Sequence, residues 1–132
     1  MIRSRTLSAC VERAADVISR GAHPRQSKGY LHFTFLVWDG EIQKIGMNSN
    51  AQSLAVDIKD YQGLHSEIAA TRNLRGVLSE LRTGFDAVNI RMNRRCQLRM
   101  SKPCACCHKW LKSLGCRYVA YSTRAGFLQT RV

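Results

Sequence analysis

The sequence predicts an α/β protein built on one mixed five-stranded sheet, and three observations lead to this fold class. Segments with apolar residues at helical spacing alternate along the chain with short segments of alternating apolar and polar residues. The predicted order is helix, two strands, helix, strand, helix, two strands, so its β-α-β-α-β middle requires parallel strands and right-handed crossovers. The 132 residues are 45% hydrophobic, which suits one core. We therefore expect a single domain spanning residues 1–132.

The first half of the chain is predicted to form a helix and a hairpin. Apolar residues recur at helical spacing over residues 6–20, which indicates an amphipathic helix. Residues 31–37 alternate as a strand, Asp39-Gly40 makes a turn, and residues 41–47 continue as a second strand. A two-residue turn of this kind joins antiparallel neighbours.

The second half is predicted to supply two helices and three strands. The last two strands are too close in sequence for a parallel pair, so they form an antiparallel C-terminal hairpin. A polar stretch from Asn48 to Gln62 leads to a predicted helix from near Leu64 to Thr83, with Val77 on its buried side. The elements predicted after it are a strand around residues 88–92, a helix over 104–114, and strands over 118–122 and 127–131.

Positive charge is concentrated in the C-terminal part of the chain. The net charge is +12, no acidic residue follows Asp86, and the last 46 residues carry ten lysines and arginines. One-sided charge of this kind attracts anions and indicates a phosphate-bearing partner, although a solubility-promoting surface is the alternative. Arg94, Arg95 and Arg99 are our candidates for contacts with phosphate or nucleic acid.

Sequence features and cysteine spacing also indicate where in the cell the protein is found. The sequence shows no signal peptide and no apolar run of membrane-spanning length. Three of the six cysteines crowd into Cys104, Cys106 and Cys107, a spacing that suits a metal better than a disulfide framework. We expect a cytoplasmic protein, or one in the host-cell cytoplasm if the source is viral, with no membrane partner.

Two separate segments predict a metal site. Cys104 and Cys107 lie three residues apart at the opening of a predicted helix with Pro103 in its first turn, so we expect both to project from one face. Cys106 is rotated off that face, so we leave it out of the ligand set. The N-terminus of the helix favours the thiolate form. A neutral histidine would complete a catalytic zinc set with an open fourth position for water. Of four histidines, His65 stands at the start of another predicted helix with Glu67 two residues on. A structural zinc knot, completed by Cys96, Cys106 or His108, is the alternative.

Glu67 is the predicted proton carrier. Residues two apart share no face within a helix, so His65 and Glu67 can serve one site only if they lie in the first turn. Zinc lowers the pKa of its water toward neutrality, and a neighbouring carboxylate can accept that proton and pass it on.

The order His65-Ser66-Glu67, then Pro103-Cys104-Ala105-Cys106-Cys107, matches the H-x-E and P-C-x-x-C signature of zinc nucleobase deaminases. Together with the stretches 46–48 and 101–123, it resembles the zinc-dependent cytidine/deoxycytidylate deaminase superfamily, and in particular small deaminase-like proteins found in viruses and some cellular genomes. The resemblance implies a three-layer sandwich with helices on both faces of the sheet and one zinc ion per chain.

The resemblance also implies a function and its substrate contacts. Asn48, with Asn50 as the fallback, would bind the sugar; Ser66 and Ser101 would contact the base through main-chain groups. We expect conversion of cytosine to uracil in a (deoxy)cytidine nucleotide or in single-stranded DNA or RNA, with adenine as the less favoured base. The open alternatives are a deaminase of free cytidine or deoxycytidine, which commonly forms a homo-oligomer, and an inactive zinc module that binds nucleic acid.

Overall fold

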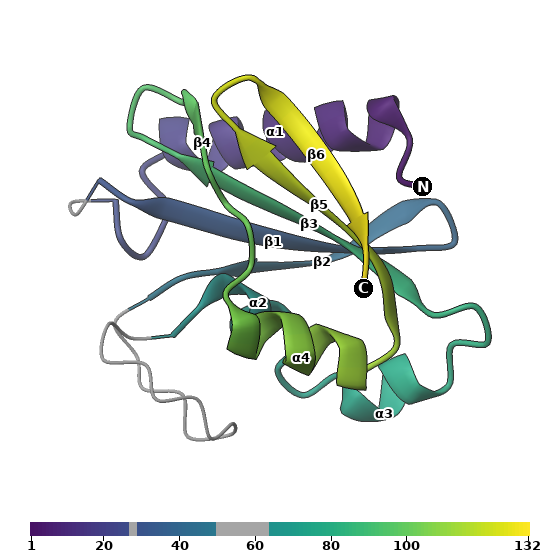
Figure 1. Ribbon diagram of the computed structural model, residues 1–132. Coiled ribbons are helices and arrows are strands. Elements are labelled where there is room, and N and C mark those ends of the chain that lie inside the picture. The colour runs from purple at the N-terminus through teal and green to yellow at the C-terminus, as the bar shows by residue number, and fades with distance from the viewer. Residues whose placement is uncertain (27–28, 50–63) are drawn as a thin grey trace.

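The computed structural model describes residues 1–26, 29–49 and 64–132 (Figure 1). One mixed sheet, with the strand order β2-β1-β3-β5-β6, crosses the molecule, and a short strand, β4, pairs with β3. The sequence predicted five of these strands but not β4. The strands are β1 (Leu31–Trp38), β2 (Glu41–Met47), β3 (Phe85–Met92), β4 (Leu98–Arg99), β5 (Cys116–Thr123) and β6 (Gly126–Arg131).

Strand directions agree with the predicted topology. β1 pairs antiparallel with both β2 and β3, β3 pairs parallel with β5, and β5 pairs antiparallel with β6. Consequently β2, β3 and β5 all run in one direction, as the β-α-β-α-β middle requires. The predicted Asp39-Gly40 turn joins β1 to β2, and both residues have positive φ angles, 53° and 73°, as tight hairpin turns with matching twist require.

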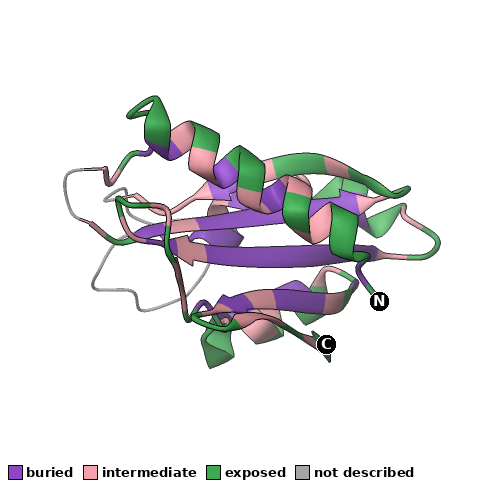
Figure 2. Cartoon of the chain, turned by 90° about the horizontal axis from the view of Figure 1, so that it is seen from above, coloured by how far each residue is buried: buried purple, intermediate pink, exposed green. Residues whose placement is uncertain are grey.

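Helices cover both faces of the sheet, which confirms the three-layer sandwich (Figures 1 and 2). On one face, α1 (Ser4–Ser19) packs its buried residues Cys10, Ala14 and Ile18 against β1 and β3. The other face is covered by α2 (Ser66–Thr71), α3 (Arg75–Ser79) and α4 (Ala105–Ser113). No helix in the described ranges is both long and apolar enough to cross a bilayer.

The predicted single helix from Leu64 to Thr83 is wrong, because the structure contains two short helices there. α2 ends at Thr71, and Asn73 adopts a left-handed conformation with φ 64°, which asparagine tolerates better than most residues. The chain therefore changes direction before α3, and Val77 is 47% exposed instead of buried. The break leaves α2 as a short element whose first turn faces α4. Most of the predicted polar connection, residues 50–62, lies outside the described residues.

Candidate functional site

His65, Cys104 and Cys107 lie together where the first turns of α2 and α4 meet. Their ligand atoms all lie within 4.8 Å of one another. Nδ1 of His65 is 3.3 Å from Sγ of Cys107 and 3.8 Å from Sγ of Cys104. Zinc–sulfur and zinc–nitrogen bonds of roughly 2.3 and 2.0 Å around a tetrahedral ion would separate nitrogen from sulfur by roughly 3.5 Å. The spacing of the donor atoms therefore fits zinc.

Cys104 and Cys107 converge by a different route from the predicted one. We expected both to project from one helical face with Pro103 in the first turn. In the structure Cys104 is the N-cap of α4, and its sulfur accepts a hydrogen bond from the main-chain N–H of Cys107 at 3.4 Å. Pro103 therefore precedes the helix. The cap brings the two sulfurs together, and the cluster of possible ligands that they form with His65 does not include Cys106.

The start of α2 presents His65 and Glu67 to the same side, as predicted. His65 is the N-cap residue and Glu67 lies in the first turn. The helix packs closely on β2 because Gly46 has no side chain: a Cβ there would overlap main-chain atoms of Ser66 and Ala70. Gly46 thus allows the close packing of α2 on the sheet and, with it, the position of His65.

Cys107 is buried beside other groups that carry negative charge when ionised. Burial raises the pKa of its thiol, and the neighbouring Glu67 and Cys104 raise it further. The protein alone therefore disfavours the thiolate. A cation at this point would offset both effects, so the electrostatics of the donor set, like its spacing, fit a divalent metal that binds thiolates. All six cysteines are free thiols, which agrees with the rejection of a disulfide framework.

Glu67 is held by a ring of buried polar side chains. Its Oε2 accepts a hydrogen bond from Nδ2 of Asn89 at 3.0 Å, and its Oε1 accepts one from Oγ of Ser66 at 3.2 Å. Thr34 closes the ring, because its hydroxyl donates to Oδ1 of Asn89 and lies 2.8 Å from Oγ of Ser66. Glu67 is only 6% exposed. The ring fixes the orientation of a buried carboxylate next to the His65/Cys104/Cys107 cluster.

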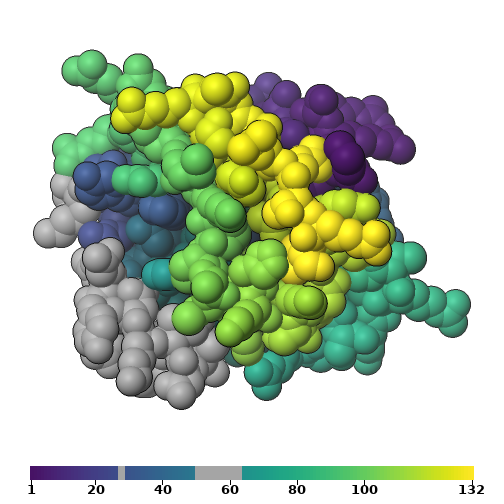
Figure 3. All heavy atoms as spheres, in the orientation of Figure 1, coloured from purple at the N-terminus to yellow at the C-terminus, as the bar shows by residue number. Residues whose placement is uncertain are grey.

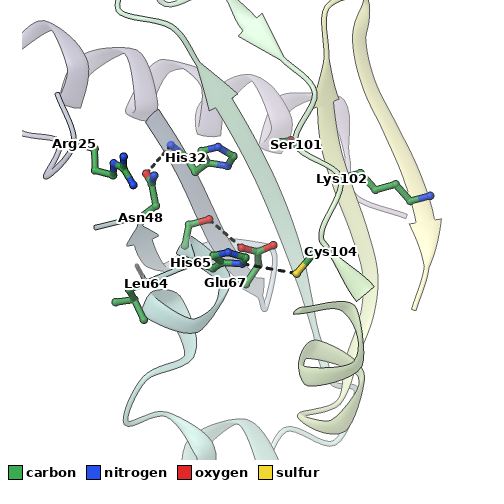
Figure 4. A pocket seen from close by; sticks show the side chains of 10 residues that line it. Arg25, His32, Asn48, Leu64, His65, Glu67, Ser101, Lys102 and Cys104 are labelled. Carbon is green, nitrogen blue, oxygen red and sulfur yellow. Dashed lines mark hydrogen bonds between the residues drawn. The ribbon is translucent and has the colours of Figure 1, made fainter. Parts of the chain in front are cut away.

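A cavity of about 240 Å³ opens above these groups, and we call it the site cavity. Figure 4 shows His65, Glu67 and Cys104 pointing toward one another, with Asn48 on the opposite wall and Lys102 turned away. The three predicted substrate contacts all line the site cavity: Asn48, Ser66 and Ser101.

Each of these residues is anchored by hydrogen bonds. Oδ1 of Asn48 accepts from the main-chain N–H of His32 at 2.9 Å, and Nδ2 donates to the carbonyl of Tyr30 at 3.3 Å. The hydroxyl of Ser101 donates to the carbonyl of Asn89 at 2.8 Å. Because an amide has two N–H groups and two lone pairs, Asn48 keeps hydrogen-bonding capacity for a ligand.

His32 and Arg25 also line the site cavity, and the sequence did not identify them. Burial, together with the positive charge of Arg91 and the neighbouring His65, lowers the pKa of His32 to about 4. The imidazole is therefore neutral near pH 7 and offers a hydrogen bond without charge. The alternation of β1 predicted that His32 lies on the face opposite Phe33, but only the folded structure shows that it shares a cavity with His65 and Cys104.

None of the three predicted phosphate contacts lines the site cavity. Arg94 and Arg95 are exposed in the connection from β3 to β4, and neither lines the site cavity. Arg99 lies in β4 and lines a separate cavity. Asn50, the fallback sugar contact, lies outside the described residues.

The fold is that of the cytidine deaminases. The structure is similar to the dCMP deaminase of the cyanophage S-TIM5 in complex with dCMP and dUMP, with a TM-score of 0.57 and 17% identity over 92% of this chain and 83% of that one. It is also similar to the cytidine deaminase of Mycobacterium leprae, with a TM-score of 0.53 and 15% identity over 90% of this chain and 88% of that one. No protein-family profile and no curated protein sequence matches the chain. At these identities the likeness establishes the cytidine deaminase-like fold.

Proposed function

We propose that the chain is a zinc-dependent hydrolytic deaminase that converts cytosine to uracil in a phosphate-bearing substrate, either a (deoxy)cytidine nucleotide or a single-stranded nucleic acid. One observation carries the proposal: a buried carboxylate, Glu67, is fixed beside a His/Cys/Cys cluster at the floor of a cavity. A module that only binds zinc would have no use for a buried carboxylate so placed. The dCMP and dUMP bound in the cyanophage structure support a nucleotide as the ligand.

His65, Cys104 and Cys107 would hold one zinc ion per chain. When bound, zinc would supply a water of lowered pKa at its open fourth position. Two thiolates and a neutral imidazole balance the charge of the ion, so the buried site would carry little net charge apart from Glu67.

Glu67 would move the protons of the reaction. It takes a proton from the attacking water, whose oxygen forms a bond to the amine-bearing ring carbon. It then delivers one proton to the ring nitrogen and assists the protonation of the departing amine. The carbon–nitrogen bond breaks, and water and cytosine yield uracil and ammonia. Asn89 and Ser66 keep both carboxylate oxygens at fixed positions during these transfers.

The remaining groups would bind and orient the substrate. Asn48 would bind the sugar through its spare N–H and lone pair. The main-chain N–H of Ser66 would bind the base, and the carbonyl of Ser101 would accept a hydrogen bond from the exocyclic amine. Asn89 already donates to that carbonyl at 3.3 Å, which leaves its second lone pair for the substrate.

The catalytic role is tested with Glu67→Gln, which keeps the shape of the side chain but removes the base. We expect kcat for dCMP or a cytosine-containing oligonucleotide to fall by about 10⁴-fold or more, at the upper end of general acid–base contributions. Zinc content and melting temperature are measured on the same samples. Glu80→Gln, at an exposed position, is the matched control. A Glu67→Gln protein with near wild-type kcat would refute the mechanism.

The metal set is tested by single changes at the ligand positions. Purified protein should contain about one zinc per chain by elemental analysis, and Cys104→Ala, Cys107→Ala and His65→Ala should each lose it. Cys106→Ala, one position from a proposed ligand but exposed, should keep it. Loss of zinc from Cys106→Ala and full zinc in Cys104→Ala would show that the assignment is wrong.

A further inference from the structure

A second cavity, of about 320 Å³, lies at the end of β3, and we call it the arginine cavity. Its walls come from the two residues before β1, the ends of β3 and β4, and the turn between β5 and β6. Figure 3 shows the segment from β4 to α4 in green, running across one face between the C-terminal strands in yellow and the start of β1 in blue. Among the lining residues are Tyr30, Arg91, Arg99, Met100 and Arg124; none of those described is acidic.

Two of the three arginines of this cavity, Arg91 and Arg99, are held in place by contacts with uncharged groups. The guanidinium of Arg91 lies over the ring of Tyr30, 4.5 Å from its centroid, and its buried Nε has no hydrogen-bond partner among the described residues. Arg99 donates to the carbonyl of Leu98 and to Oε1 of Gln97, which are both neutral. No ion pair between described residues involves these arginines. Three positive charges around one cavity repel each other, and a bound anion would remove that repulsion.

The rim of the arginine cavity is also apolar. Tyr30 is 58% exposed and Met100 is 52% exposed, and they are two of the five large hydrophobic side chains most exposed in the described ranges. A phosphate group alone would not cover them. A nucleobase would, because its flat face stacks on aromatic side chains while its backbone phosphate meets a cation.

The two cavities are next to each other. Tyr30 lines the arginine cavity and His32 lines the site cavity, and two residues along a strand span roughly 7 Å. On the other wall Met100 lines one cavity and the adjacent Ser101 lines the other. His32 is also the strand partner of Arg91. A ligand that fills both cavities therefore passes over one narrow wall.

We propose that the arginine cavity binds the backbone phosphate of a neighbouring nucleotide while a cytosine of the same strand occupies the site cavity. Tyr30 and Met100 then cover the neighbouring base. This inference rests on the proposed function and names its substrate class, single-stranded nucleic acid. The site cavity has a guanidinium of its own, Arg25, for the phosphate of the reacting nucleotide. A free triphosphate would bring further phosphates but no second base for the apolar rim.

The test measures binding, so it does not depend on turnover. In a Glu67→Gln background, a fluorescein-labelled pentadeoxynucleotide with a central cytosine among thymines is bound at several salt concentrations and followed by anisotropy. The double change Arg99→Gln with Arg124→Gln should weaken binding by about tenfold or more. It should also reduce the slope of log affinity against log salt by about 0.7 for each phosphate that the protein no longer neutralises. Tyr30→Ala should weaken binding by about tenfold, because the neighbouring base can no longer stack on the ring.

The matched control is Arg5→Gln with Arg13→Gln, which removes the same charge from exposed positions on α1. It should bind the oligonucleotide within about twofold of the parent, because long-range effects of single charges are screened by salt. Competition by dCMP should be the same in both double variants, since dCMP needs only the site cavity. Equal oligonucleotide binding by the two double variants would overturn the inference.

Competition by dCTP separates the two sources of phosphate. If the Arg99/Arg124 variant loses affinity for dCTP as strongly as for the oligonucleotide, the cavity serves the phosphate tail of a free nucleotide and the inference is wrong. Wild-type protein that deaminates dCMP but binds no oligonucleotide also overturns it, while the proposed function stands. Arginine-dependent oligonucleotide binding without deamination of any substrate supports the binding site and refutes the proposed function instead.

Discussion

The two faces of the central sheet are built from the same strands but bury different chemistry. Toward α1, β1 and β3 place apolar side chains such as Phe33, Phe35 and Ile90, all fully buried. Toward α2 and α4, alternate residues of these strands include Thr34 and Asn89, which pair with each other across β1 and β3. A strand that alternates in this way lets one face supply apolar burial while the other fixes polar groups for a site.

The contrast shows that polar burial here depends on complete hydrogen bonding. Thr34 and Asn89 are at most 3% exposed, and a buried polar group without a partner would destabilise the fold by about 1–3 kcal/mol. Their hydrogen bonds to each other, and that of Asn89 to Glu67 on α2, meet this requirement. Substitutions on one face at a time can therefore test the two kinds of burial separately.

The largest expected effect is on the apolar face. Phe33→Ala should lower the free energy of unfolding by about 3–5 kcal/mol, because it removes a fully buried ring and leaves a cavity under α1. Urea denaturation measures the change, and the folded fraction should keep its zinc. Leu128→Ala is the control, since Leu128 is 53% exposed and should change stability by no more than about 0.5 kcal/mol. Similar losses in both variants would contradict the assignment of this face as the main source of stability.

The second prediction concerns pH, since a half-buried histidine, His32, lies on the site face. The folded pKa of His32 is about 4, against 6.5 for the free side chain. The unfolded chain therefore binds a proton that the folded protein excludes between these two values. The stability of the folded state that depends on a neutral His32 is therefore complete above pH 6.5 and is lost as the pH falls toward 4.

Between pH 6.5 and 4.5, the free energy of unfolding of the wild-type protein should therefore fall by about 2–3 kcal/mol more than that of His32→Gln. Urea denaturation with a chelator present measures both proteins under conditions in which metal release does not contribute. Part of the acid sensitivity should remain in the variant, because burial also lowers the pKa of His23 on the α1 side, where its ring packs edge-on against Phe33. Parallel stability curves for the two proteins would show that His32 is not protected from protonation.

The smallest expected effect on stability, and the most specific one, comes from the polar ring. Thr34→Val keeps the side-chain shape but removes the hydroxyl that donates a hydrogen bond to Asn89. The free energy of unfolding should therefore fall by about 1–2 kcal/mol. Because the ring orients Glu67, kcat should fall by about tenfold or more while KM and zinc content stay close to wild type. Thr130→Val, on the exposed edge strand β6, is the control. An unchanged kcat would mean that the ring is structural only.

The sequence allowed prediction of those parts of the fold and site that depend on local patterns. The hairpin turn at Asp39-Gly40 and the two motifs that hold His65, Glu67, Cys104 and Cys107 each lie within a few consecutive residues. Their convergence was expected from the chemistry of a catalytic zinc set and from the deaminase signature, and the structure brings the three ligand atoms within 4.8 Å of one another.

What could not be predicted depends on contacts between distant segments. Thr34 and Asn89 are 55 residues apart, and neither carries a motif, so only the register of β1 against β3 identifies the polar ring. The arginine cavity likewise combines residues from the start of β1 to the turn after β5. The break at Asn73 depends on one left-handed residue, which apolar spacing does not reveal.

The close packing of α2 on Gly46 limits which positions of this protein can be varied in directed evolution. Most positions on the exposed side of α1 can vary without contacting the His65/Cys104/Cys107 cluster, so a library built there can explore charge and solubility. At position 46 the smallest possible addition, one methyl group, already meets main-chain atoms of Ser66 and Ala70. Backbone cannot rotate aside as a side chain does, so the whole first turn of α2 would shift, and His65 and Glu67 with it. Position 46 is therefore best left unvaried.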